Sequence, residues 1–255
     1  MKSLSHCFSF YSRHTLPNSE VGRVVEIYNE DLSVRITRVL RLRAGETIII
    51  FDDVYSQLLR LEASTFQSKK IITATVLERT VHKQLKPRVN LCIGLLKKEP
   101  FQEIAYYAAA MGATHLVPVI TAKVQRSWGG EKELERLTKI MIAAAEQSKQ
   151  FILPKIEEPL TFEHFRLSSF CTPQMQSGVY FDVHGQPLLK QLNQYKTAQP
   201  KSITLFWGPE GGLLPQETAA LDHLGFSCSV LTPTVLRAVD AVAVGLGSFV
   251  SCLST

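Results

Sequence analysis

One short segment, Phe206-Trp207-Gly208-Pro209-Glu210-Gly211-Gly212, narrows the possible folds of this chain more than any other. The apolar run at residues 203–207 predicts a buried strand, and Pro215-Gln216-Glu217 predicts the first turn of a helix. Glycines between a strand and a helix allow positive φ and let a ligand lie directly against the backbone. The pattern also fits a tight turn without a ligand, but this density of glycine, proline and acid favours a ligand loop. It matches neither G-x-G-x-x-G nor a P-loop, so nucleotide phosphate binding is not indicated.

From residue 88 onward, predicted strands and helices alternate. Strands are predicted at residues 89–95, 115–120, 178–183, 203–207 and 226–231, and helices at residues 100–111, 131–149 and 236–253. This alternation is typical of βαβ units and predicts an α/β domain with a parallel sheet at residues 88–255. The last helix is apolar over most of its surface, so we expect it to be buried, either in the core or against another subunit.

Three loops follow the late strands of this predicted sheet, at residues 182–186, 208–212 and 231–237. The carboxyl ends of parallel strands meet at one edge of a sheet, where ligands bind. We therefore expect the three loops to form a single site.

Residues 1–80 predict a separate, smaller domain. Strands are predicted at residues 21–28, 48–51, 57–62 and 70–79, and Asn29-Glu30-Asp31 predicts the cap of a helix at residues 32–43. Leu32, Ile36, Val39 and Leu40 fall on one face of this helix. The whole is interpreted as a small β-barrel with one helix, followed by a linker at residues 81–88.

Four arginines, Arg35, Arg38, Arg41 and Arg43, recur along the predicted helix. A solvated helix face is the usual explanation of such charges, but the acids that would pair with them at i+4 are missing. Residues 1–86 also carry 13 Lys and Arg against 9 Asp and Glu, whereas the rest of the chain is nearly balanced. Both observations favour an anion-binding face that meets a polyanion.

Composition excludes several classes of protein. The 255 residues are 45% hydrophobic and 20% charged, which is ordinary for a globular protein, and no apolar run is long enough to span a membrane. The start of the chain lacks the pattern of a secretory signal. Five scattered cysteines without a C-x-x-C motif are expected to be reduced thiols, and no metal site is expected. These features predict a cytoplasmic protein.

The chain resembles a known family through four signatures in the same order. Gly208-Pro209-Glu210-Gly211-Gly212 and Leu231-Thr232-Pro233-Thr234-Val235-Leu236-Arg237 resemble the SPOUT methyltransferases, and in particular the bacterial enzymes that methylate N3 of a uridine in 16S ribosomal RNA. Val39-Leu40-Arg41-Leu42-Arg43-Ala44-Gly45 is similar to the signature of that family's PUA-like RNA-binding domain, and Ala145-Glu146-Gln147-Ser148 resembles its mid-chain signature. The resemblance covers nearly the whole chain.

The resemblance implies a fold and a set of partners. It implies an N-terminal PUA-like β-barrel, a C-terminal SPOUT α/β domain with a trefoil knot, and S-adenosylmethionine as the cofactor. It also implies a homodimer that acts on 16S ribosomal RNA or the assembled small ribosomal subunit. The cofactor-binding residues carried over by position are Gly208, Pro209, Glu210, Gly211, Leu231, Thr232, Val235 and Leu236.

Arg237, Asp240 and Glu210 are the expected catalytic residues. A cation at Arg237 would stabilise charge that develops on the uracil oxygens, and Glu210 or Asp240 would accept the N3 proton. The chain has Ala238-Val239-Asp240-Ala241 where the family has Thr-Glu-Thr-Ala, and Lys149-Gln150 where the family has an arginine. Asp240 therefore fits an ordinary helix-start acid as well as a base, and Glu210 fits a structural role.

Two other functions remain open from the sequence. The first is a methyltransferase of the same fold that acts on another RNA nucleotide. The second is a catalytically silent RNA-binding assembly factor that has lost the Thr-Glu-Thr residues. A measurement of S-adenosylmethionine binding distinguishes the silent factor from the two enzymes, because the silent factor is expected to bind none.

Overall fold

The computed structural model describes residues 7–12, 20–66, 70–171 and 176–253. The chain divides into two compact units. The N-terminal unit comprises Met1–Lys83 and Ala145–Ile152, and the C-terminal unit comprises Gln84–Ala144 and Leu153–Thr255. Residues 1–6, on which the prediction about a secretory signal depends, lie outside the described part. None of the helices among the described residues is long and apolar enough to cross a membrane.

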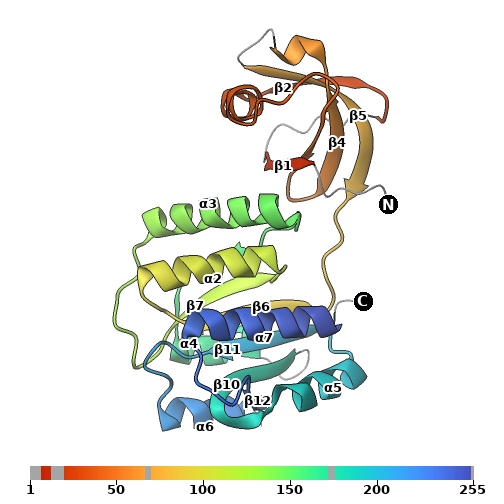
Figure 1. Ribbon diagram of the computed structural model, residues 1–255. Coiled ribbons are helices and arrows are strands. Elements are labelled where there is room, and N and C mark those ends of the chain that lie inside the picture. Colours follow the sequence, from red (N-terminus) through yellow and green to blue (C-terminus); the bar gives the residue numbers. More distant parts are fainter. Residues whose placement is uncertain (1–6, 13–19, 67–69, 172–175, 254–255) are drawn as a thin grey trace. The chain divides into compact units, whose positions relative to one another are not determined.

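The N-terminal unit is built on one five-stranded sheet with the order β1-β3-β4-β5-β2 (Figure 1). Its strands are β1 (Phe8–Tyr11), β2 (Val24–Tyr28), β3 (Thr47–Phe51), β4 (Tyr55–Leu61) and β5 (Ile71–Val81). The four predicted strands are confirmed, whereas β1, which pairs in parallel with β3, was not predicted. Among the described residues, no hydrogen-bonded pairing joins the edge strands β1 and β2, so the sheet they bound is open.

The helix of this unit differs from its prediction. Asn29 caps it as expected, since its side chain accepts a hydrogen bond from Leu32 N, but α1 spans only Glu30–Val34 and continues as a π-helix, η2 (Arg35–Val39). The Leu40 N–H donates to Arg35 O, five residues back. This wider turn rotates Val39 away from the face that buries Leu32 and Ile36, on which it was predicted to lie, so Val39 is 67% exposed. Leu40 still packs against that core.

The end of this helix was also predicted too late. The helix ends at Val39, four residues before Arg43, and Arg41 then adopts a positive φ of 53°, which prevents the helix from continuing. The arginines that were expected on one helix face therefore lie on three different pieces of backbone.

The C-terminal unit contains a parallel sheet, which confirms the α/β prediction. The order is β12-β10-β11-β6-β7-β8, with β9 also paired to β7. The strands are β6 (Arg88–Gly94), β7 (His115–Ile120), β8 (Lys155–Ile156), β9 (Leu160–Thr161), β10 (Gln176–Pro187), β11 (Ser202–Trp207) and β12 (Phe226–Val230). The helices are α2 (Lys98–Ala110), α3 (Glu131–Ser148), α4 (Phe162–Leu167), α5 (Leu188–Ala198), α6 (Pro215–His223) and α7 (Ala238–Leu253).

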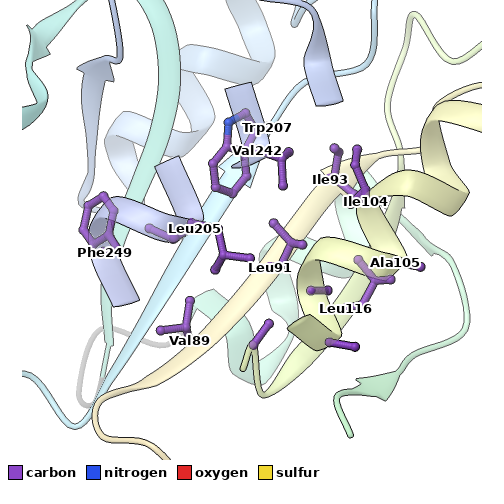
Figure 2. Packing of buried hydrophobic residues seen from close by; sticks show 14 of the residues in the cluster. Val89, Leu91, Ile93, Ile104, Ala105, Leu116, Leu205, Trp207, Val242 and Phe249 are labelled. Carbon is purple, nitrogen blue, oxygen red and sulfur yellow. The ribbon is translucent and has the colours of Figure 1, made fainter. Parts of the chain in front are cut away.

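The main core of this unit lies between the sheet and the helices α2 and α7, which pack against each other (Figures 1 and 2). Alternate residues of the central strands, such as Leu91 and Leu205, face Val242 and Phe249 of α7. Val242 and Phe249 are fully buried. Burial in the core, the first of the two expectations for the apolar last helix, is therefore confirmed.

Candidate functional site

The three predicted loops do meet at one edge of the sheet. The loop at residues 182–186 lies within β10, and the other two follow β11 and β12. These three strands are neighbours in the order β12-β10-β11 and run parallel. A small cavity of about 120 Å³ opens there. It is lined by Phe181, Asp182, Val183, Trp207, Ser229, Val230, Leu231, Thr232, Thr234, Val235, Leu236 and Ala241.

A bulge in β10 shapes one wall of this cavity. Phe181 and Gln186 both pair with Ser229 of β12, so the residues between them loop out of the sheet. A Cβ on Gly185 would lie 2.3 Å from the carbonyl carbon of Ser229. Only glycine therefore allows the returning loop to lie this close to β12.

Part of the lining is aromatic. The rings of Phe181 and Trp207 stack with centroids 4.3 Å apart and an interplanar angle of 19°. Gly245 of α7 lies directly behind them, where a Cβ would be 2.6 Å from Trp207 Cζ2 and 3.3 Å from Leu231 Cδ2. A glycine in the last helix thus fixes the position of three residues that line the cavity.

Unsatisfied polar groups surround these apolar walls. Trp207 Nε1 is buried without a hydrogen-bond partner. In the described part of the chain, the backbone N–H groups of residues 231, 232 and 234–236 make no hydrogen bond either. Buried donors are normally satisfied, so Trp207 Nε1 is available to a ligand that accepts a hydrogen bond. Thr234 and Val235 are exposed, so water can satisfy their N–H groups until a ligand replaces it.

Half of the predicted cofactor residues line the cavity. Leu231, Thr232, Val235 and Leu236 do so, whereas the predicted residues at positions 208–211 lie outside its lining. Sequence reasoning missed Phe181 and Gly245, because their importance comes from distant residues that they contact. Trp207 was part of the glycine segment and could have been chosen from it.

The glycine loop itself is held by polar contacts. Lys97 N donates to Glu210 Oε1 at 3.1 Å, and Lys123 Nζ donates to Gly211 O at 2.9 Å. At the start of the loop, a Cβ on Gly94 would lie 2.5 Å from Pro209 Cδ. The loop is therefore packed against the ends of neighbouring elements, and Glu210 serves at least as a structural tether.

Arg237 and Asp240 form an ion pair at the start of α7. Arg237 Nε lies 2.9 Å from Asp240 Oδ2, and the two side chains are 83% and 45% exposed. The hydrogen bond to Asp240 raises the pKa of the Arg237 guanidinium. The pair flanks the cavity in sequence, because Leu236 and Ala241 both line it. The displaced acid of the sequence is thus the partner of the predicted catalytic cation.

The four arginines predicted to bind RNA, Arg35, Arg38, Arg41 and Arg43, are all exposed, but their environments differ. Arg35 forms two hydrogen bonds to the carboxylate of Glu146, at 3.1 and 2.7 Å, and its guanidinium lies 4.9 Å from the ring centre of Phe10. The hydrogen bond to Glu146 raises the pKa of Arg35. Arg38, Arg41 and Arg43 make no ion pair with any described residue, which leaves their charges available.

Comparisons with known proteins agree with this architecture. Residues 83–249 match the family model of an RNA methyltransferase domain. The chain is 32% identical to ribosomal RNA small subunit methyltransferase E from Synechocystis, over 100% of this chain and 82% of that protein. It is 29% identical to the enzyme of the same name from Mycobacterium bovis, over 92% and 88%.

Solved structures show the same fold. The enzyme of that name from Neisseria gonorrhoeae, bound to S-adenosyl methionine, has a TM-score of 0.78 at 22% identity and covers 95% of this chain and 96% of its own. A putative methyltransferase from Legionella pneumophila, also in complex with this cofactor, has a TM-score of 0.77 at 21% identity and covers 96% and 97%. The chain belongs to the RNA methyltransferase family that this domain defines.

Proposed function

We propose that this protein transfers a methyl group from S-adenosylmethionine to N3 of a uridine in 16S ribosomal RNA. The observation that carries the proposal is the cavity at the carboxyl ends of β10, β11 and β12, where the unsatisfied Trp207 Nε1 donor lies beside apolar walls. It belongs to a chain whose relatives over its full length are named as small-subunit ribosomal RNA methyltransferases.

The residues of the cavity fit the cofactor. Phe181, Leu231 and Leu236 offer apolar surface for an adenine ring, and the free backbone N–H groups of the last loop match its ring nitrogens. Trp207 Nε1 adds one more donor without a protein partner. Asp182 lies on the rim and suits the ribose hydroxyls or the amino group of the methionine part. When bound, S-adenosylmethionine supplies a methyl group on a positively charged sulfur.

The side chains at the start of α7 act on the base. Arg237 stabilises the negative charge that develops on the uracil oxygens as N3 loses its proton. Asp240 orients Arg237 through the ion pair. It is the better placed of the two predicted proton acceptors, because it directly precedes Ala241 in the cavity lining, whereas Glu210 lies outside that lining. Most of the remaining acceleration comes from holding the base in line with the methyl group.

The same proposal covers the finer architecture and the partners. The C-terminal unit contains a trefoil knot, and the N-terminal unit is a PUA-like barrel that binds RNA through Arg38, Arg41 and Arg43, with Arg35 committed to Glu146. The protein acts in the cytoplasm as a homodimer, and its substrate is 16S ribosomal RNA or the assembled small subunit. The domain at residues 1–80 binds RNA, and the domain at residues 88–255 carries out the methyl transfer.

Purified protein tests the proposal directly. Binding of S-adenosylmethionine is measured by calorimetry, and methyl transfer to 16S ribosomal RNA and to small subunits is followed with labelled cofactor. We expect binding and a labelled N3-methyluridine. A different labelled nucleoside would show that the protein methylates another RNA nucleotide. Absence of cofactor binding would show that it is a catalytically silent RNA-binding factor.

A further inference from the structure

A second cavity of the C-terminal unit lies at the opposite edge of the sheet from the cofactor site. Its volume is about 610 Å³, and it is bounded by the start of β6, the end of α5, the start of β11 and the end of α7. Figure 1 shows these ends gathered on one side of the unit. A strand of six residues spans about 20 Å, so one small ligand cannot occupy both cavities.

The rim of this cavity is strongly basic. Lys86, Arg88, Lys196 and Lys201 all line it, and none of the described lining residues is acidic. All four side chains are exposed, and none forms an ion pair with a described residue. Buried Tyr195 and Leu253 contribute an apolar floor.

Helix ends explain only part of this charge. Cations are favoured near helix C-termini, and both α5 and α7 end at the cavity. Each such end carries about half a negative charge, so the two together offset about one of the four positive charges. About three remain uncompensated, which is enough to attract a polyanion.

We propose that this basic cavity is a second RNA-binding site, which holds phosphates of the RNA strand about 20 Å from the cofactor cavity. The inference rests on the proposed RNA substrate. Cations from two distant chain segments, residues 86–88 and 196–201, lie around an apolar floor. This arrangement suits an extended strand, whose phosphates meet the rim while a sugar or base covers the floor. Neutralising two of the cations removes two phosphate contacts.

The test compares three double variants of the full chain in binding to 16S ribosomal RNA. Lys196→Gln/Lys201→Gln should weaken binding on the order of tenfold near physiological salt and lower the log–log salt slope by about 1.5 to 2. Lys196→Arg/Lys201→Arg should keep the wild-type slope. Lys132→Gln/Lys139→Gln, which removes two exposed charges from α3, should also keep it. Equal slopes in all three variants would mean that the cations only offset the helix ends.

Cys252 provides a second readout, because its exposed thiol lines the same cavity. Bound 16S ribosomal RNA should slow alkylation of Cys252 several-fold, as measured by mass spectrometry of the peptide. If inorganic phosphate at the same phosphate concentration protects equally well, the site is one for small anions and the RNA assignment is overturned. Unprotected Cys252 in saturated complex would also overturn it.

These results are separable from the proposed function. RNA binding that depends on Lys196 and Lys201 in a protein without methyl transfer would refute the methyltransferase proposal and leave this site standing. Normal methyl transfer with an unchanged salt slope would refute the site alone. Cofactor affinity and thermal unfolding of each variant confirm that it is folded.

Discussion

At the scale of single residues, the proposed chemistry depends on Arg237, a cation at a helix start, where positive charge is unfavourable. Arg237 precedes the N-terminus of α7, where the helix dipole repels positive charge. Asp240 compensates with an ion pair, but both side chains are largely exposed, and exposed pairs contribute little to stability. Variants at either position should therefore fold normally, so their kinetics report on the reaction.

Arg237→Ala should lower turnover on the order of 100-fold or more, because it removes a donor aimed at developing charge. Cofactor affinity should stay at the wild-type value, since Arg237 does not line the cofactor cavity. Methyl transfer to 16S ribosomal RNA under saturating cofactor is the measurement. A normal rate would remove Arg237 from the catalytic account.

Asp240→Asn tests the proton acceptor separately. If Asp240 accepts the N3 proton, turnover at neutral pH should fall about 100-fold and recover in part as the pH rises, because hydroxide replaces the lost base. Arg237→Ala should show no such recovery. An Asp240→Asn enzyme with an ordinary rate and pH profile would reduce Asp240 to a surface partner of Arg237.

Gly245 and Gly247 form a matched pair in α7. A Cβ at Gly245 meets Trp207 at 2.6 Å, whereas one at Gly247 meets only Met111, at 3.6 Å. Gly245→Ala should displace the cavity wall and weaken cofactor binding about tenfold. A tenfold loss of affinity corresponds to about 1.4 kcal/mol, which lies within the roughly 1–3 kcal/mol that overpacking usually costs. Gly247→Ala should leave cofactor affinity unchanged and raise stability by about 0.5–1 kcal/mol. Calorimetry and thermal unfolding measure both, and equal cofactor affinities would contradict the described wall.

At the scale of elements, the π-turn redistributes the charges of the N-terminal unit. Because η2 ends at Val39 and Arg41 turns into the left-handed region, Arg38 and Arg41 point from different backbone segments. Arg35 is held by Glu146 and is unsuited to a clean test. Arg38 and Arg41, which form no ion pair with a described residue, are therefore the residues to substitute in a test of RNA binding.

Arg38→Gln/Arg41→Gln should reduce the salt slope of RNA binding by about 1 per contact while cofactor affinity is retained. Arg23→Gln/Lys83→Gln removes two other exposed charges of the same unit and serves as the control. If both double variants keep the wild-type slope, Arg38 and Arg41 form an ordinary solvated surface.

His115 on β7 couples this part of the sheet to pH. Burial lowers the pKa of His115, and the nearby charges of Lys155 and Arg88 lower it further. Together they outweigh Glu157, which raises it. A histidine with a folded pKa below its ordinary value of about 6.5 is neutral in the folded state while the unfolded chain binds a proton. Stability should therefore fall as pH drops below about 6.5, until the folded pKa is reached.

His115→Gln should reduce this loss of stability between pH 7 and pH 5. The measurement is the free energy of unfolding by denaturant at both pH values, in wild type and variant. An unchanged difference between the two pH values would show that His115 titrates normally. Burial also lowers the pKa of His82. Because His82 is present in both wild type and variant, its contribution cancels and the comparison isolates that of His115.

Periodicity predicts most elements of this chain, because alternation and helical spacing are properties of a single segment. The strand at His115–Ile120 and the helix with buried Phe101, Ile104 and Ala108 both follow their predicted patterns. The π-turn and β1 were missed, since the first is a single irregular turn that ordinary helical spacing does not reveal and the second forms by pairing with a distant strand.

At the scale of the whole molecule, the three-loop edge follows from parallel topology, so the general place of the site was predictable. Its walls were not, because Phe181, Trp207 and Gly245 come together only through the order of strands and the packing of α7. The basic cavity was hidden for the same reason: its four cations come from segments more than 100 residues apart. Sequence spacing carries no information about such neighbours.

The most direct measurement is mass spectrometry of 16S ribosomal RNA nucleosides from cells that lack the gene, with and without complementation. The account predicts that one N3-methyluridine disappears on deletion, returns with the wild-type gene and does not return with Arg237→Ala. An unchanged level of N3-methyluridine in the deleted strain would contradict the central claim, even with the fold intact.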